Sequence, residues 1–104
     1  MNEKLLPLLG IARRAGRLSL GFDAATESMQ KGKSQLLLLA NDLSERTVRN
    51  ISMTARHTET CMIATDFSMH QFGAAVGKDA GIISVNDKGF AKKMKTLCAD
   101  KEHP

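Results

Sequence analysis

The sequence predicts an α/β fold: a three-layer α/β/α sandwich around a small, mostly parallel sheet of about four strands. Short apolar segments alternate along the chain with longer segments whose apolar residues recur at helical spacing. Such alternation is typical of helices packed on a central sheet. The apolar segment Leu36–Leu39 has no polar alternation, which favours a strand covered by helices on both faces.

The elements expected in the first half are a helix over residues 2–15, a strand over 17–20, a helix over 21–31 and a strand over 36–40. Both helices carry apolar residues three and four positions apart. A glycine ends each helix, Gly16 and Gly32, where the left-handed cap conformation suits this residue. Arg13 and Arg14 complement the helix dipole, and with Arg17 they form either a basic corner or a solvated helix end.

The elements expected in the second half are helices over residues 44–56, 68–76 and 88–97 and strands over 61–64 and 82–85. Ser44 is expected to cap the first of these helices, with half a capping box because Thr47 stands where Glu or Gln would complete it. Asp66 and the pair Asn86-Asp87 end the two strands in turns. The whole chain, 1–104, is expected to form a single domain, with residues 98–104 as a frayed tail.

Composition narrows the classes of function. Fifteen Lys and Arg against eleven Asp and Glu give a net charge of +4, which fits a nucleic-acid partner without requiring one. Four Phe without Trp or Tyr disfavour base stacking on aromatic platforms as the main mechanism. Cys61 and Cys98 follow no pattern, and no secretory signal is recognised, so we expect reduced thiols in a cytoplasmic protein. No apolar segment is long enough for a membrane span.

The motifs favour a non-enzymatic protein without a cofactor or metal. No glycine-rich dinucleotide or P-loop motif is present, and Lys31-Gly32-Lys33-Ser34 precedes a strand, whereas a phosphate loop follows one. The three histidines are scattered, and the cysteines lack a partner at ligand spacing. One carboxylate follows each of three expected strands: Asp42, Asp66 and Asp87. These residues either form turns or line an acidic pocket at the edge of the sheet. An enzyme using Cys61 or one of these acids would need a perturbed thiolate or paired carboxylates.

The helix that begins at Gly21 is the best candidate for a binding site. Its first turn offers unpaired backbone N–H groups and the positive end of the helix dipole. Gly21 carries no side chain, so it either lets a ligand approach the backbone or merely eases a tight turn. We expect a ligand to meet this helix start and the neighbouring strand exit near Asp42.

Several segments resemble the L7Ae/L30e ribosomal protein family, and within it the small YlxQ-like bacterial branch. They are LLGIARRAGRLSLG (8–21), LLLLANDLSERT (36–47), FGAAVGKDAGIISVND (72–87) and KGFAKKM. The similarity covers nearly the whole chain. It implies the α/β/α sandwich with a four-stranded mixed sheet, and RNA binding, often at kink-turns or related bent motifs.

The resemblance also implies the RNA-contacting segments. Family members typically carry Gly-x-Asn-Glu-x-x-Lys at the start of the second helix; Gly21 matches, whereas Asp23, Ala24 and Glu27 stand at the Asn, Glu and Lys positions. An anion in place of a cation should be unfavourable beside a phosphate. The other contact segments correspond to residues 41–43 and 77–80. With Arg17, Lys31 and Lys33 added from charge alone, the candidate RNA-binding residues are Arg17, Gly21, Phe22, Asp23, Ala24, Glu27, Lys31, Lys33, Asn41, Asp42, Leu43, Gly77, Lys78, Asp79 and Ala80.

Two hypotheses follow. In the first, a bent RNA, ribosomal or kink-turn-like, docks on the Gly21 helix start between the two loops, with ribosomal proteins as further partners. RNA shape contributes more than sequence to this recognition. In the second, the same fold is a protein-interaction or assembly module without kink-turn binding, which Asp23, Ala24 and Glu27 would permit.

Overall fold

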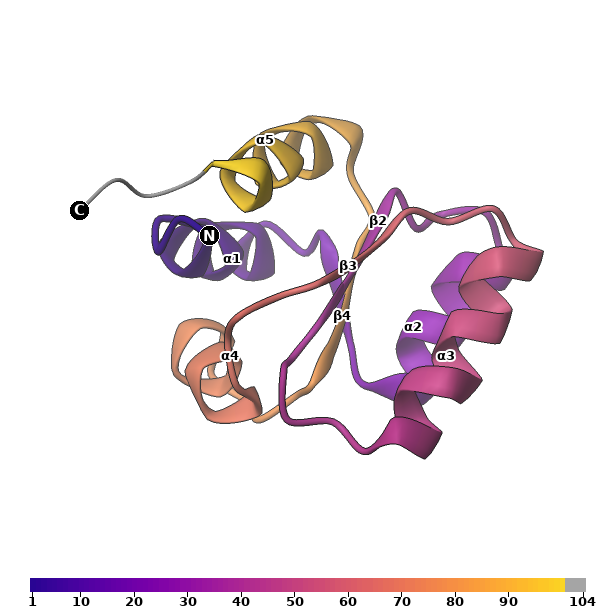
Figure 1. Ribbon diagram of the computed structural model, residues 1–104. Coiled ribbons are helices and arrows are strands. Elements are labelled where there is room, and N and C mark those ends of the chain that lie inside the picture. Colours follow the sequence, from indigo (N-terminus) through magenta and orange to yellow (C-terminus); the bar gives the residue numbers. More distant parts are fainter. Residues whose placement is uncertain (101–104) are drawn as a thin grey trace.

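Five helices and four strands alternate along residues 1–100, the part of the chain that the computed structural model describes (Figure 1). Most elements lie within a few residues of the ranges expected from the sequence. Their bounds are α1 (Leu5–Arg14), β1 (Leu18–Leu20), α2 (Phe22–Gln30), β2 (Leu36–Leu39), α3 (Glu45–His57), β3 (Met62–Ala64), α4 (Met69–Val76), β4 (Ile82–Val85) and α5 (Lys88–Ala99).

The four strands form one mixed sheet in the order β1–β4–β2–β3. β2 and β3 are parallel, whereas β4 runs antiparallel to both of its neighbours, β1 and β2. The expectation of a mostly parallel sheet therefore needs a correction. Three strands share one direction, but two of the three adjacent pairs are antiparallel because the reversed strand β4 lies between β1 and β2. The start of α4 and Gly81, which precedes β4, both contact the end of β2, so the chain re-enters the sheet from the end at which β3 finishes.

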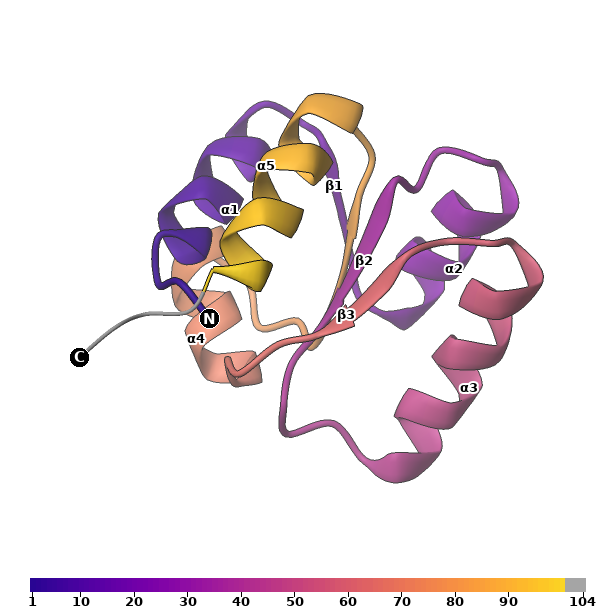
Figure 2. The ribbon, with the colours of Figure 1, turned by 45° about the horizontal axis from the view of Figure 1, so that its top comes forward.

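The sheet is covered on both faces, which confirms the three-layer prediction. Helices α1, α4 and α5 pack on one face, and α2 and α3 pack on the other (Figure 2). Along β2, Leu36 and Leu38 belong to the first core, and the intervening Leu37 and Leu39 belong to the second. All four side chains are buried, and each contributes about 1.5–3 kcal/mol of hydrophobic stabilisation.

Side chains cap three of the helices at their amino-terminal ends. The Ser44 hydroxyl accepts a hydrogen bond from the Thr47 N–H, as predicted. Ser68 and Gln71 form a full capping box at α4, and the Asp87 carboxylate accepts from the N–H of Phe90 at α5. These caps satisfy N–H groups that have no partner within the helix.

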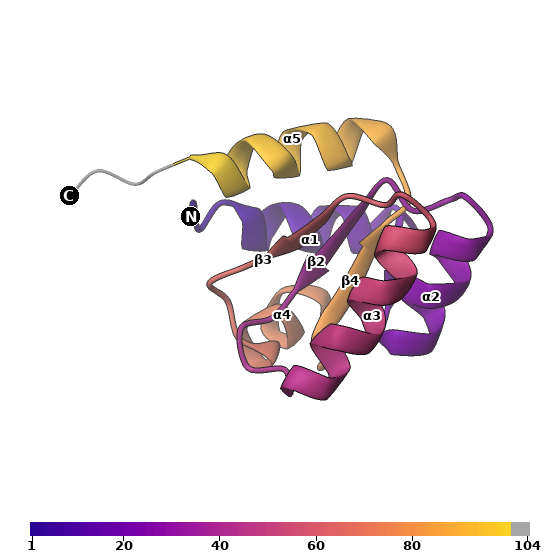
Figure 3. The ribbon, with the colours of Figure 1, turned by 45° about the vertical axis from the view of Figure 1, so that its right-hand side comes forward.

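The two ends of the described chain lie together. Helices α1 and α5 run side by side (Figure 3), and the Asn2 side-chain amide donates to the Asp100 carboxylate at 2.8 Å. Helix α5 continues to Ala99, so Cys98 and Ala99 belong to the helix and not to the expected frayed tail; residues 101–104 of that tail lie outside the described residues. No helix within residues 1–100 combines the length and the apolar character that a membrane span requires.

Candidate nucleic-acid interface

Three connections meet at one end of the sheet: β1–α2, β2–α3 and α4–β4 (Figure 1, lower end). Hydrogen bonds fix this meeting. The Gly21 N–H donates to the Ile82 carbonyl oxygen, and the Ala40 N–H donates to the Gly81 carbonyl oxygen, both at 2.8 Å. We call this surface the Gly21 edge and define it as residues 21–24, 41–43 and 77–80. The structure thus brings together the three segments that the sequence nominated separately.

The start of α2 is open to solvent. Gly21 is its N-cap residue, with φ 96° and ψ 169°, a conformation that is almost restricted to glycine. In contrast to α3, α4 and α5, no side chain among the described residues caps this helix. Phe22 is 38% exposed beside the first turn. The N–H groups of the turn and the helix dipole therefore face outward, where a phosphate or a base edge can accept from them.

Residues 41–43 hold the edge together. The Asn41 side-chain amide donates to the Asp66 carbonyl oxygen at 3.0 Å, and the Asp42 carboxylate accepts from the Met69 N–H at 2.9 Å. Leu43 lies against Gly81, where an added Cβ would come within 2.4 Å of the Leu43 Cδ2 atom. These contacts give all three residues structural roles in addition to the predicted RNA contacts.

The loop 77–80 contributes a cation and an anion to the edge. Gly77 ends α4 in the left-handed conformation, and Lys78 and Asp79 are exposed. The Asp79 carboxylate packs closely against Gly73. A Cβ atom added at Gly73 would be only 2.0 Å from Asp79 Oδ1. Ala80 is buried at 5% exposure, so its side chain is not available to a ligand. The loop therefore offers Lys78 as its phosphate contact.

Carboxylates outnumber cations on the Gly21 edge. Asp23, Asp42 and Asp79 are exposed there, and Lys78 is the cation within the defined residues. Asp42 is partly compensated, because its carboxylate lies at the start of α4, where the helix dipole favours negative charge. The Gly21 edge therefore offers a ligand backbone N–H donors framed by two loops, but little positive charge.

Glu27 is paired within its own helix. Its carboxylate accepts a hydrogen bond from the Lys31 ammonium at 2.5 Å. This hydrogen bond and the charge of Lys31 lower the pKa of Glu27. Both side chains are largely exposed, so the pair stabilises α2 only weakly. Glu27 and Lys31 line a shallow hollow with Ser19, Ala24, Ser28, Lys33 and Asn86.

The cations nominated from charge alone do not join the Gly21 edge. Arg17 precedes β1, and its carbonyl oxygen accepts from the Asn86 N–H at the end of β4. Lys31 and Lys33 lie between the end of α2 and the start of β2. All three residues therefore lie at the opposite end of the sheet from Gly21.

A chain of polar side chains under α2 was not foreseen. Ser34, Ser84, Asn86, Ser19 and Ser28 are linked in this order by hydrogen bonds of 2.7–2.8 Å. Ser84 is fully buried in β4. Its signal in the sequence was a serine inside an otherwise apolar strand. The chain ties β1, β4 and α2 together beneath the hollow that Glu27 and Lys31 line.

Within residues 1–100, no three His, Cys, Asp or Glu side chains gather as metal ligands would. Cys61 and Cys98 are free thiols; Cys61 is exposed, and partial burial raises the pKa of Cys98.

Comparisons with known proteins agree with the fold and the resemblance. The model of the ribosomal protein L7Ae/L30e/S12e/Gadd45 family matches residues 3–100. The chain is 30% identical to "RNA-binding protein YlxQ" of Enterococcus faecium over 92% of each chain, and 29% identical to the Bacillus subtilis protein of the same name over 88% of this chain and 91% of that one. It is 24% identical to the large ribosomal subunit protein eL30 of Saccharomyces cerevisiae over 92% of this chain and 93% of that one.

Two examples represent the solved structures that are similar to this one. A protein of unknown function from Bacillus halodurans aligns with a TM-score of 0.87 and 28% identity, over 93% of this chain and 98% of that one. A Giardia lamblia 15.5 kD RNA-binding protein aligns with a TM-score of 0.74 and 17% identity, over 93% and 92%, and so supports the fold alone. The family model spans almost the entire described chain, and the chain therefore belongs to the ribosomal protein L7Ae/L30e/S12e/Gadd45 family.

Proposed function

We propose that this chain is a non-catalytic, cytoplasmic RNA-binding protein and that structured RNA docks on the Gly21 edge. The observation that carries the proposal is the open start of α2, framed by residues 41–43 and 77–80 at the same end of the sheet. Family membership supports it, as do relatives that are named RNA-binding proteins or proteins of the large ribosomal subunit.

The chemistry of docking follows from the groups on the edge. The N–H groups of the first turn of α2 donate to phosphate oxygens or base edges, as helix starts do in anion sites. The exposed Phe22 ring packs against an unstacked base, which bent RNA makes accessible. Lys78 neutralises a phosphate. A kink-turn-like or ribosomal RNA is the expected ligand, because a bent backbone can follow the two loops that flank Gly21.

The test is a titration of a kink-turn hairpin RNA at several salt concentrations. Affinity should fall as salt rises, with a log–log slope of about 0.7–0.9 for each neutralised phosphate. Lys78→Gln should lower the slope by about one, whereas Lys93→Gln on α5 removes the same charge far from the edge and should change it little. If the wild-type protein shows no binding at low salt, the proposal is wrong.

The excess of acids on the edge favours one alternative, a protein-interaction or assembly module with the same fold. Glu27→Lys separates the two functions. Under the RNA hypothesis, this substitution replaces an anion by a cation and should strengthen RNA binding. Under the assembly hypothesis, it should weaken a protein complex or leave it unchanged, with no gain in affinity for RNA.

A further inference from the structure

The end of the sheet opposite the Gly21 edge carries a dense group of cations. Its members come from three parts of the chain: the entry to β1, the connection between α2 and β2, and one side of α5. We define this basic band as Arg17, Lys31, Lys33, Lys88, Lys92 and Lys95. All six side chains are exposed.

Backbone contacts show that the band is continuous. The Gln35 N–H donates to the Val85 carbonyl oxygen at 2.8 Å, which holds the start of β2 beside the end of β4. The Gln35 side chain donates to the Lys33 carbonyl oxygen and also lines a groove with Lys88, Lys92 and Lys95. Gln35 therefore joins the lysines before β2 to the lysines of α5.

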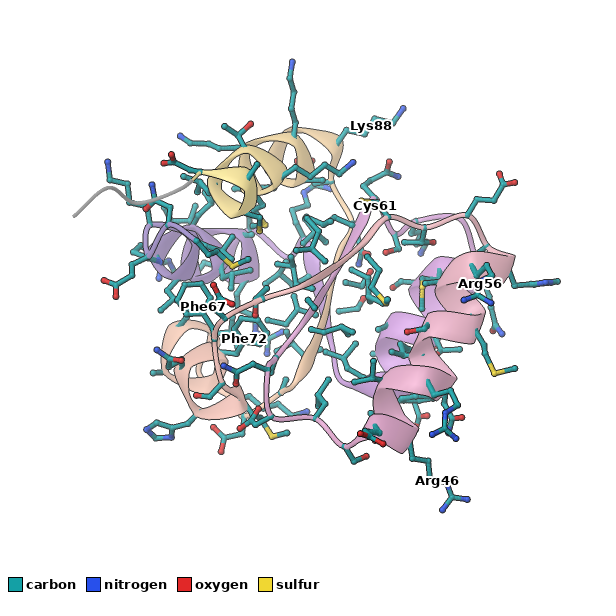
Figure 4. All side chains as sticks on the ribbon, viewed as in Figure 1. Arg46, Arg56, Cys61, Phe67, Phe72 and Lys88 are labelled. Carbon is teal, nitrogen blue, oxygen red and sulfur yellow. The ribbon has the colours of Figure 1, made fainter. Side chains whose placement is uncertain are left out.

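The lysines of α5 form a row. Lys88, Lys92 and Lys95 are separated by four and three residues, so they share one side of the helix over roughly 10 Å. With Gln35, Ala91 and Thr96 they line a groove of about 360 Å³. Within residues 1–100, none of the three forms an ion pair. Figure 4 shows Lys88 at the start of α5, and Arg56 and Arg46 at opposite ends of α3.

Charge differs between the band and the Gly21 edge. The two carboxylates beside the band residues are both engaged: Glu27 pairs with Lys31, and Asp87 caps α5. A third, Glu59, is exposed in the α3–β3 connection at the same end of the sheet. The six cations less Glu27 and Asp87 give the band a net charge of +4, equal to that of the whole chain. The Gly21 edge, by contrast, holds three exposed carboxylates and one lysine. An RNA on that edge alone would leave most of its phosphates without a cation.

We propose that the basic band is a second RNA-contacting surface, which binds the phosphodiester backbone of a segment beyond the part held at the Gly21 edge. This inference rests on the proposed function. The strands that separate the two surfaces have four residues or fewer, so the gap is roughly 13 Å. An RNA that spans it must continue past the docked motif as a helical arm or a folded-back strand.

The composition of the band favours a nucleic acid over other anionic partners. Ala91 is the one apolar side chain that lines the α5 groove within the described residues. Membrane-surface helices bury an apolar face in the bilayer boundary, and protein interfaces depend on buried aromatic or apolar anchors. Contacts to an RNA backbone need only cations at a suitable spacing, and they add affinity without sequence preference.

The experiment compares two RNAs and two variants. The RNAs are a minimal kink-turn hairpin and the same hairpin with one arm extended by a helical turn. The test variant is Lys88→Gln/Lys92→Gln/Lys95→Gln, and the matched control is Lys4→Gln/Arg49→Gln/Lys93→Gln, which removes the same charge from other surfaces. All substituted side chains are exposed, so thermal unfolding should show that both variants fold.

The expected result depends on RNA length. The wild-type protein should bind the extended hairpin with a salt slope larger by about 2–3 than that for the minimal one. The test variant, which keeps Arg17, Lys31 and Lys33, should lose most of this difference, and the control variant should keep it. If the test variant shows the same salt slopes as the control variant with both RNAs, the basic band is not an RNA-contacting surface. The proposal for the Gly21 edge would be unaffected by that result.

Two further outcomes would also decide whether the basic band contacts RNA. Failure of the wild-type protein to bind either RNA would overturn the proposed function together with the band. Lysine-dependent binding to vesicles of anionic lipid, without any dependence on RNA length, would assign the band to a membrane surface and overturn the RNA interpretation.

Discussion

The Asp42 carboxylate accepts a hydrogen bond from the Met69 N–H at 2.9 Å, across 27 positions of sequence. Asp42 follows β2, and Met69 is the first residue of α4. The carboxylate therefore caps a helix to which it does not belong and fixes α4 against the Gly21 edge. A residue nominated as an RNA contact thus has a structural role that opposes phosphate binding.

This double role gives the first prediction. Asp42→Ala should lower the free energy of unfolding by about 1 kcal/mol, the usual effect of losing a helix cap. Asp42→Asn keeps an acceptor oxygen and should destabilise less. The Asn variant also removes a negative charge from the edge, so it should bind RNA more tightly than the wild-type protein. Urea unfolding and RNA titration check the two effects, and equal losses of stability would contradict the capping role.

Gly21 gives the second prediction. An added Cβ would have open space there, so the cost of Gly21→Ala comes from the backbone conformation, about 1–3 kcal/mol. A shifted turn would also misalign the N–H groups of α2, so affinity for RNA should fall. Gly32→Ala is the control, because Gly32 also has a positive φ and open space but lies at the other end of α2. Both variants should lose stability, and only Gly21→Ala should lose affinity for the minimal kink-turn hairpin, which does not extend to the basic band, measured well below the unfolding temperature.

The sequence predicted the layers and most helix ends because these depend on local patterns. The run Leu36–Leu39 required cover on both faces, and Ser44 marked the start of α3. The direction of β4 could not be predicted in this way. Strand direction depends on which end of the sheet the chain re-enters, and the contacts of α4 that decide this are between residues far apart in sequence.

The arrangement of the candidate site was predicted in part for the same reason. The family motif and the turn at Gly21 identified the segments of the edge, and strand ends gather at the edges of a sheet. Charge alone could not place Lys31 and Lys33, because the length of α2 carries them to the far end of the sheet. The lysines of α5 are far from Lys31 and Lys33 in sequence, and only the packing of Gln35 against the α5 groove connects the two groups.

The buried polar chain gives the third prediction. Asn86 accepts from the Ser84 hydroxyl at 2.7 Å and donates to Ser19 at 2.8 Å. Asn86→Ala would leave these hydroxyls with fewer partners, one of them fully buried, and should lower the free energy of unfolding by about 1–3 kcal/mol. Asn50→Ala, at an exposed position on α3, is the control and should change stability little. An Asn86 variant as stable as the Asn50 variant would show that the chain contributes nothing net.

The last prediction concerns Glu27, whose pKa is lowered by the hydrogen bond and the charge of Lys31, and to a smaller extent by the charge of Lys33. Because the folded pKa lies below the ordinary value of 4.5, the pair is complete above that pH and is lost as the pH falls through the folded pKa. The small stabilisation should therefore be present at neutral pH and vanish in acid.

The pKa of Glu27 can be measured directly from its side-chain carboxyl chemical shift, followed by NMR as the pH is changed. Lys31→Gln should return the pKa of Glu27 close to its ordinary value, whereas Lys33→Gln removes the same charge and should raise it much less. High salt should shrink the difference between the wild-type protein and Lys31→Gln, because exposed charges are screened. If both variants shift the pKa equally, Lys31 is not the specific partner. Glu27 would then interact with the surrounding cations in general and not with Lys31 in particular. Replacing Glu27 by Lys would in that case not release the Lys31 ammonium to bind RNA.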